Sequence, residues 1–295
     1  MIGQLQEIGR FPIKSMLGEA LERATVAESG IDGDRAHALV DAETGKVASA
    51  KDPRLWADLL AFRARYVDPD EARAGAPVEV TLPDGTRVRT DDPDAAARIG
   101  AAVGRPVSIS SAAPADGCGQ YDYVWEVDGL APDEVVSGSQ TGVTEEGRPL
   151  STMPVALMAP GTFQDVAPIT IMTTAALATM AKQHPDGRWE PPRFRNNLVL
   201  DVSGGDDVDG IVENDWIGRR LAIGSAVFEV TAPTPRCVMT TLPQGDLPRD
   251  RQILRTVARE NRLEFAGFGI WACLGVYASV VEPGEITLGD PVTLR

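Results

Sequence analysis

The chain has 295 residues, 43% hydrophobic and 24% charged, which is typical of a globular protein with one large core or two smaller ones. Its formal net charge of −15 disfavours nucleic acid and anionic membranes as partners, because like charges repel. No segment approaches the roughly 20 apolar residues of a membrane span, and the N-terminus lacks a signal-peptide layout, so we expect a cytoplasmic protein.

Short strands and tight turns dominate the first hundred residues. Strands at 78–82 and 86–89 flank a Pro-Asp-Gly turn and predict a β-hairpin. A helix is expected to open at Asp92 and to end at Gly104, because an N-cap and a first-turn proline precede an apolar face. Residues 1–105 are therefore predicted to form a small, β-rich mixed domain.

The segment 113–149 differs from the rest in composition. It is rich in Gly, Ser, Asp, Glu and Pro, with aromatic residues at Tyr121, Tyr123 and Trp125. Long irregular loops are often either functional lids or merely mobile. We favour a partly ordered, loop-rich insertion over a dedicated binding flap.

Strands and helices alternate in the remainder of the chain. A strand at 169–172 is expected to lead into a helix that starts at Thr173 and Thr174. Further elements are predicted as strands at 198–200, 220–224, 227–230, 268–281 and 292–294 and a helix at 250–262. Many short strands with scattered helices predict a β-barrel-like α+β domain over 106–295.

Cys237 is the most informative residue of the sequence. It follows Arg236 and two prolines in the run APTPRCVMTT, residues 232–241. Proline fixes the backbone and would aim the side chain, and the neighbouring guanidinium favours the thiolate, which attacks electrophiles or binds soft metals. From these residues alone, a buried structural cysteine remains the alternative.

Few other side chains can share such chemistry. Cys118 and Cys273 stand far from Cys237 and from each other, so zinc and iron–sulfur sites are not expected, and Cys273 is interpreted as a core residue. The two histidines, His37 and His184, make a Cys–His or Ser–His nucleophile hard to build.

Several segments of the chain, taken together, resemble the MOSC family, named for the C-terminal domain of molybdenum cofactor sulfurases. The layout is most similar to the two-part proteins typified by the mitochondrial amidoxime-reducing component. Besides the cysteine run, the segments are FPIKS at 11–15, DGDR at 32–35, AKDPRL at 50–55, RFRNNLVL at 193–200 and GEITLGDPV at 284–292. The segment 213–218 also resembles a family segment, and we interpret it as structural, with Trp216 packed and the acids solvated. The resemblance implies an N-terminal β-barrel-like region followed by a MOSC β-barrel domain with peripheral helices.

The resemblance also implies a site between the two parts. Cys237 becomes the ligand of molybdenum, and the pyranopterin of the molybdenum cofactor is held by Lys14, Ser15, Arg35, Thr173, Thr174, Arg195, Asn197 and Arg236. Lys51 could approach the cofactor. The residues themselves leave alternatives open: the helix start at Thr173 suits an anion or is an ordinary N-cap, and Arg35 equally suits a surface ion pair.

The implied function is a molybdenum-cofactor-binding oxidoreductase that reduces N-hydroxylated or related N-oxygenated small molecules. Because the chain has no clustered cysteines and no evident flavin or haem site, electrons are expected from a separate reductase or carrier protein. The alternative is a sulfur-carrier or persulfide-transfer protein that uses Cys237. A specialised biosynthetic enzyme is suggested only by the 113–149 segment.

Overall fold

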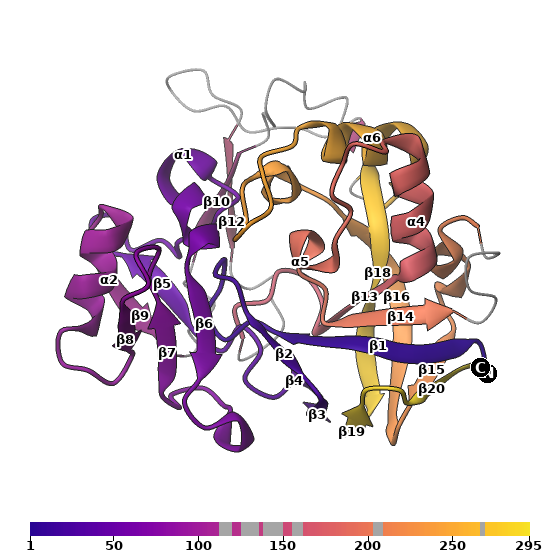
Figure 1. Ribbon diagram of the computed structural model, residues 1–295, viewed down its shortest axis with the longest axis horizontal. Helices are drawn as coiled ribbons and strands as arrows, with labels where there is room; N and C mark the ends of the chain where they lie inside the picture. Colours follow the sequence, from indigo (N-terminus) through magenta and orange to yellow (C-terminus); the bar gives the residue numbers. More distant parts are fainter. Residues whose placement is uncertain (112–119, 125–135, 138–149, 155–161, 203–208, 266–268) are drawn as a thin grey trace.

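A computed structural model describes residues 1–111, 120–124, 136–137, 150–154, 162–202, 209–265 and 269–295. The molecule has two parts, an N-terminal part on the left of Figure 1 and a larger barrel on the right. Both chain ends lie on the barrel side, where Ile2 N donates to the carbonyl oxygen of Val292 at 2.7 Å.

Seven strands close the barrel. Their order is β18-β13-β14-β1-β20-β15-β16, and β16 pairs with β18 to complete the ring. All neighbours are antiparallel except β13 and β14, which are parallel. The bounds are β1 Gly3–Arg10, β13 Ile169–Thr173, β14 Leu198–Val202, β15 Arg220–Ile223, β16 Ala226–Pro235, β18 Ile270–Glu282 and β20 Pro291–Leu294. The strand-rich architecture with a barrel, expected from the sequence, is confirmed.

Every strand of the ring contributes to an apolar barrel core. It includes Leu5, Ile171, Leu200, Leu221, Phe228, Val276 and Val292. Strand β1 lies in the stretch 1–105 that was expected to form a separate N-terminal domain, but it pairs with β14 and β20 of the barrel. The two parts are therefore joined by a shared sheet as well as by the chain.

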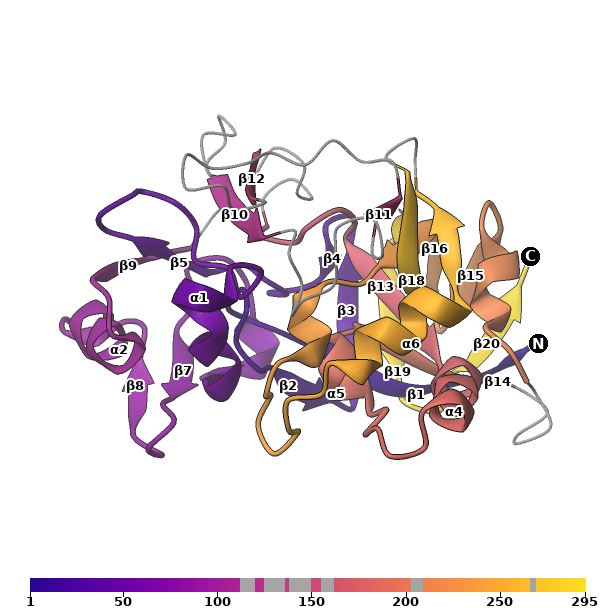
Figure 2. The same ribbon diagram turned by 90° about the horizontal axis from the view of Figure 1, so that it is seen from above.

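Helices cover the outside of the barrel beside β18 (Figures 1 and 2). The helical segments here are α4 Thr174–Gln183, α5 Pro191–Phe194, η5 Val212–Trp216, η6 Val238–Thr241 and α6 Gln252–Glu260. Leu254 and Val257 of α6 belong to the same buried cluster as Trp271 and Leu274 of β18. Strand β18 is buried from Trp271 to Ala278 because one face lines the barrel and the other meets the helices.

The N-terminal part contains small sheets and a core of its own, which includes Phe62, Val80 and Ile99, whereas Ala24, Val26 and Ile31 of this part belong to the barrel core. Its strands are β2 Glu19–Leu21, β3 Arg23–Ala27, β4 Gly30–Ile31, β5 Ala38–Asp41, β6 Arg63–Tyr66, β7 Val78–Thr81, β8 Arg87–Arg89 and β9 Val107–Ser110. Its helical segments are α1 Pro53–Trp56, η1 Ala57–Ala61, η2 Pro69–Glu71 and α2 Ala95–Val103. The predicted hairpin is β7–β8, and α2 ends as expected at Gly104, whose φ of 80° needs no Cβ.

The structure describes short strands within the predicted insertion and directly after it. Strand β10 Gln120–Val124 pairs with β12 Leu150–Pro154, and β11 Val136–Ser137 pairs with β18. The rest of 113–149, including Trp125 and Cys118, lies outside the described residues. Two strands from other regions complete the sheets: β17 Arg262–Glu264 pairs with β18, and β19 Gly284–Thr287 pairs with β3 of the N-terminal part. Within the described residues, no helix combines the length and the apolar character needed to cross a membrane.

Candidate functional site at the junction of the two parts

Cys237 lies where β16 leaves the barrel and η6 begins. Its backbone is extended, with φ −126° and ψ −178°, and its carbonyl oxygen accepts hydrogen bonds from Thr240 N at 3.1 Å and Thr240 Oγ1 at 2.9 Å. The side chain of Cys237 is partly exposed, whereas Cys273 is fully buried, as expected for a core residue. Of the two cysteines that the structure describes, Cys237 is therefore the accessible one.

Arg236 fastens the cysteine loop to the barrel. Its guanidinium donates to the carbonyl oxygens of Leu274 at 2.7 Å and Phe194 at 2.9 Å, and to Asn196 Oδ1 at 2.9 Å. The side chain is buried, and burial lowers the pKa of Arg236 to about 10. These three bonds occupy one donor on each guanidinium nitrogen, so Arg236 fixes the direction in which Cys237 leaves the strand.

The other side of the loop is held by Arg193 and Gln244, which the sequence analysis did not single out. Arg193 is completely buried and donates to the carbonyl oxygens of Thr240 at 3.0 Å and Pro248 at 3.1 Å. Gln244 Nε2 donates to the carbonyl oxygen of Met239 at 2.9 Å. The loop that carries the thiol is thus pinned by side chains on both sides.

Two lysines from the N-terminal part face an aspartate from the loop before β13. Asp165 Oδ1 lies 2.7 Å from Lys14 Nζ, and Asp165 Oδ2 lies 2.9 Å from Lys51 Nζ. Lys14 Nζ also donates to the carbonyl oxygen of Phe163 at 2.8 Å. Burial lowers the pKa of Lys14 to about 8, although the neighbouring carboxylate of Asp165 acts in the opposite direction.

Two arginines meet over one aromatic ring. The guanidinium carbons of Arg35 and Arg195 lie 4.5 Å and 4.4 Å from the centre of the Phe11 ring. Arg35 Nη2 donates to the carbonyl oxygen of Arg195 at 2.8 Å, and Arg35 Nη1 lies 3.3 Å from Asn197 Oδ1. This contact joins a turn of the N-terminal part to the segment that precedes β14.

Asp34 connects the pieces of this arrangement. Its buried carboxylate accepts hydrogen bonds from Phe11 N at 2.8 Å, Gln164 Nε2 at 2.7 Å and Asn197 Nδ2 at 2.9 Å, and it pairs with Arg35 Nη1. The donor farthest from Asp34 in the sequence is Asn197, at a separation of 163 residues. A buried carboxylate with this many donors stays satisfied and fixes the geometry of its neighbours.

Three residues in the described part of the chain, other than glycines, have positive φ: Ser15 at 65°, Arg35 at 47° and Arg195 at 56°. All three belong to the set expected to bind a cofactor. The left-handed conformation is unfavourable for residues with a Cβ, and such residues cluster at functional sites. Their coincidence with the Lys14, Arg35 and Arg195 side chains marks this junction as the candidate site.

Comparison with known proteins agrees with the fold. Residues 2–97 match the family model of the MOSC N-terminal beta barrel domain, and residues 160–293 match that of the MOSC domain. The chain belongs to the MOSC domain family.

Curated relatives are distant or short matches. The chain is 23% identical over 303 residues to molybdenum cofactor sulfurase of Drosophila grimshawi, covering 99% of this chain and 34% of that protein. It is 26% identical over 136 residues to mitochondrial amidoxime-reducing component 1 of Mus musculus, covering 45% of this chain and 38% of that protein. The chain thus spans well under half the length of these relatives. Among solved structures, the YuaD protein of Bacillus subtilis matches with a TM-score of 0.42 and 10% identity, covering 100% of this chain and 96% of that one.

In this MOSC chain, Thr173 and Thr174 meet carboxylates. Thr173 Oγ1 donates to Glu213 Oε2 at 2.7 Å and accepts from Ala176 N at 3.0 Å, and Thr174 Oγ1 lies 3.3 Å from Asp201 Oδ1. Thr173 is therefore an ordinary N-cap of α4, and Glu213 accepts its hydroxyl hydrogen. Binding of a cofactor by Thr173 and Thr174 stays a prediction, since the described contacts show only what their hydroxyl groups bond to in the chain.

Arg236 lowers the pKa of the Cys237 thiol, as expected from the sequence, but its effect is smaller than that of burial. Burial raises the pKa of the Cys237 thiol, and this effect outweighs the lowering by Lys51, the Met239 N–H and Arg236. The stronger cationic influence comes from Lys51 across the junction, not from the adjacent arginine. Arg236 is engaged with Leu274, Phe194 and Asn196.

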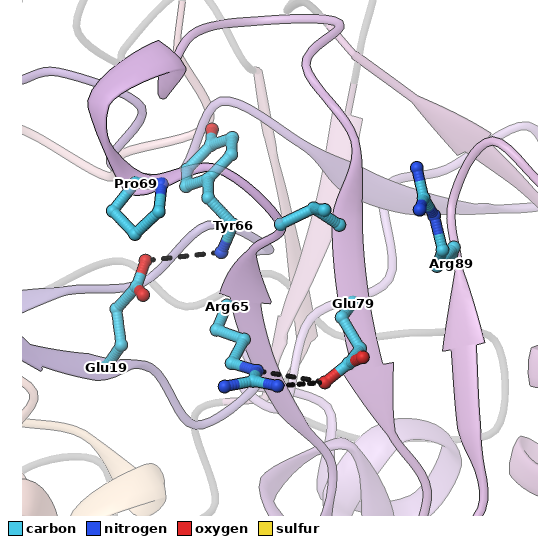
Figure 3. Close-up of a pocket in the computed structure, with 7 residues that line it drawn as sticks. Glu19, Arg65, Tyr66, Pro69, Glu79 and Arg89 are labelled. Atoms are coloured by element: carbon cyan, nitrogen blue, oxygen red, sulfur yellow. Dashed lines mark hydrogen bonds and ion pairs between the residues drawn. The ribbon is translucent and has the colours of Figure 1, made fainter.

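A pocket lies on the N-terminal part, and Cys237 is not among its lining residues (Figure 3). It is lined by Glu19, Arg65, Tyr66, Val67, Pro69, Glu79 and Arg89. Arg65 Nε donates to Glu79 Oε1 at 2.9 Å within the pocket, whereas Glu19 pairs with Arg10 and Arg89 with Asp91. None of the residues expected to bind a cofactor lines this pocket.

Proposed function

We propose that this chain is an oxidoreductase that binds the molybdenum cofactor through Cys237 and reduces N-hydroxylated or related N-oxygenated small molecules. Electrons come from a separate reductase or carrier protein. Reduction of one N–OH group consumes two electrons and two protons and releases water.

The observation that carries the proposal is an accessible thiol beside a cation cluster, defined as Lys14, Lys51, Arg35 and Arg195. The charges of Lys51 and Arg35 lower the pKa of Lys14, and the charge of Arg35 lowers the pKa of Arg195. Lys51 and Arg195 both interact electrostatically with Cys237. Such a donor set fits an anionic organic group that carries its own metal. Three or more His, Cys, Asp or Glu side chains that could hold a metal ion do not come together among the described residues.

The molybdenum cofactor would supply a two-electron redox centre to this site. In the proposal, Cys237 ligates the metal, and Lys14, Ser15, Arg35, Arg195 and Asn197 hold the pterin and its phosphate. Arg236 positions the cysteine loop, because its guanidinium is bonded to Leu274, Phe194 and Asn196. In the proposal, Thr173 and Thr174 serve only as the start of α4, where Thr173 caps the helix.

Burial raises the pKa of the Cys237 thiol, which disfavours the free thiolate, whereas a metal that binds the sulfur displaces the proton. Metal binding at Cys237 is therefore expected to release a proton.

The second candidate is a sulfur-carrier protein in which Cys237 holds a persulfide. It is favoured by the match to a molybdenum cofactor sulfurase along 99% of this chain. The accessible position of the thiol suits this role as well.

The two candidates differ in what the purified protein does. Protein from a host that makes the cofactor is given a chemical electron donor and an N-hydroxylated amidine, and the amidine formed is measured by chromatography. The oxidoreductase proposal predicts product in proportion to bound molybdenum. The sulfur-carrier candidate predicts no reduction and a cyanide-labile sulfur that is absent from Cys237→Ser.

A further inference from the structure

The outer face of α6 carries three arginines in line. Arg251, the N-cap, has helical φ −70° and ψ −23°, and Arg255 and Arg259 follow at intervals of four residues, which places all three on one face of the helix. Arg251 and Arg259 are exposed and Arg255 is half-buried, whereas Leu254 and Val257 on the opposite face belong to the core. We call Arg251, Arg255 and Arg259 the arginine stripe. The helix that bears it lies on the outside of the barrel (Figure 2).

Helix stability does not account for the arginine stripe. Like charges four residues apart on a helix repel each other. A positive charge at Arg251 also opposes the helix dipole, whose N-terminal end favours acidic residues, and the first turn of α6 contains none. Binding of a negatively charged partner explains this arrangement, because the partner offsets both effects.

The surroundings of the stripe are basic although the chain as a whole is acidic. Residues 249–264 contain five arginines and three acidic residues, whereas the formal net charge of the chain is −15. Of these acids, Asp250 has a side chain that is only 19% exposed, and Glu260 pairs with Arg259. Glu264 lies beyond the helix, in β17. The stripe is thus a local positive surface on a negative molecule.

The start of α6 is bonded to the loop that carries Cys237. Asp250 N donates to the carbonyl oxygen of Thr241 at 2.9 Å, and Thr241 ends the turn η6 that follows Cys237. Val238 of that turn lies in the same buried cluster as Leu254 of α6. A protein that binds along the stripe therefore lies beside the cysteine loop.

We propose that the arginine stripe is the docking surface for an acidic electron-carrier protein. The inference rests on the proposed function, which takes its electrons from a separate protein. The net charge of −15 repels an acidic protein, and a positive stripe both attracts it locally and fixes its orientation next to the cysteine loop. Two encounters with a one-electron carrier supply the two electrons of the proposed reduction, and the two protons come from water.

The probe is a small acidic ferredoxin, which carries one electron. Its binding to the full chain is measured by titration calorimetry at about 20 mM ionic strength, where screening is weak. The triple variant Arg251→Gln, Arg255→Gln, Arg259→Gln is expected to bind ferredoxin at least about tenfold more weakly than the wild type. The triple variant Arg251→Lys, Arg255→Lys, Arg259→Lys keeps the charge and should bind like the wild type.

The matched control removes three exposed arginines from the N-terminal part. The side chains of Arg23, Arg73 and Arg87 are 76%, 67% and 66% exposed. The variant Arg23→Gln, Arg73→Gln, Arg87→Gln changes the net charge by the same amount and should bind ferredoxin within about twofold of the wild type. Unchanged binding in the glutamine variant of the stripe, or an equal loss in this control, would overturn the inference.

Should the triple variant fail to fold, single substitutions provide the test. Arg259→Gln, on a side chain that is 59% exposed, should weaken ferredoxin binding about threefold, and the loss should vanish at about 500 mM salt. Arg87→Gln should bind like the wild type. Equal affinities in these two single variants would contradict docking at the stripe.

Double-stranded DNA serves as the competing polyanion. At the same ionic strength, a duplex of about 20 base pairs should bind the chain more weakly than ferredoxin does, because its charge density meets the repulsion of the whole chain. Tighter binding of the duplex, lost in the glutamine variant of the stripe, would overturn the assignment to a protein partner.

Turnover distinguishes failure of this inference from failure of the proposed function. With a chemical electron donor, the glutamine variant of the stripe should form amidine at the wild-type rate per bound molybdenum. With reduced ferredoxin as the donor, the same variant should be at least about tenfold slower than the wild type. Equal ferredoxin-driven rates would overturn docking at the stripe, whereas absence of amidine with the chemical donor in both proteins would overturn the proposed function and leave the binding result standing.

Discussion

Replacing Glu213 with Gln should remove a pH-dependent loss of stability. Glu213 is completely buried, and burial raises the pKa of its carboxyl from 4.5 to about 7, against the opposing hydrogen bonds from Thr173. Because the folded chain holds this proton more tightly than the unfolded chain, the stabilisation is fully present below pH 4.5 and is lost as pH rises through about 7. At about 1.4 kcal/mol per pKa unit, the full contribution is about 3 kcal/mol.

The measurement is urea unfolding of the wild type and Glu213→Gln at a series of pH values from 5 to 8. The glutamine imitates the protonated carboxyl and does not titrate, so the variant should gain about 2.5 kcal/mol relative to the wild type between pH 5 and pH 8. Glu229→Gln, on an exposed side chain, serves as the control and should follow the wild type. A constant difference between wild type and Glu213→Gln across the range would refute the reasoning.

Two further substitutions test how the cysteine loop is held. Gly275 has φ +78°, and an added Cβ would lie 2.6 Å from the carbonyl oxygen of Ile171 and 3.0 Å from Arg236 Nη2. Because of this strain and crowding, Gly275→Ala should lower the free energy of unfolding by more than about 2 kcal/mol. Gly289→Ala, at φ +85° with nothing within 4 Å, should lose only about 1 kcal/mol, and equal losses would contradict the role of crowding. Arg193→Met leaves the carbonyl oxygens of Thr240 and Pro248 without this donor, and the free energy of unfolding in urea should fall by about 3 kcal/mol. An unchanged free energy of unfolding would show that these bonds do not hold the loop.

Most of the regular structure could be predicted because its signals are local. The strand before Thr173, the helix that follows it, and the hairpin that leads to Cys237 all occur where apolar periodicity and turn residues place them. The placement of β1 in the barrel could not be predicted, since it depends on pairing with β14 and β20, far away in the sequence.

The sequence names candidate site residues, but it does not reveal the contacts that these residues make in the folded chain. Arg236 carries the expected charge, yet its guanidinium is bonded to three acceptors, because the barrel brings carbonyl oxygens to it. Asp165 has no sequence signal of its own, since its role arises from two lysines more than 110 residues earlier in the chain. The acids of segment 213–218 were interpreted as solvated, and this is wrong for Glu213, which pairs with Thr173 in the interior.

Three of the residues that the sequence analysis singled out share a left-handed backbone conformation. Ser15, Arg35 and Arg195 adopt positive φ without being glycines, so their backbone must be held by tertiary contacts such as Arg35 N to the carbonyl oxygen of Phe11 at 2.7 Å. A sequence motif records which residues stand there, but the strain becomes visible only in three dimensions.

The central claim is that the thiol of Cys237 holds a molybdenum cofactor. Its most direct test is the content of molybdenum and pterin per chain in the wild type, Cys237→Ser and Cys273→Ala, all produced in a host that makes the cofactor. The account predicts near one molybdenum per chain in the wild type and in Cys273→Ala, whose altered cysteine is buried, and a strong loss in Cys237→Ser. Equal molybdenum and pterin in the wild type and Cys237→Ser, whether high or negligible, would contradict it.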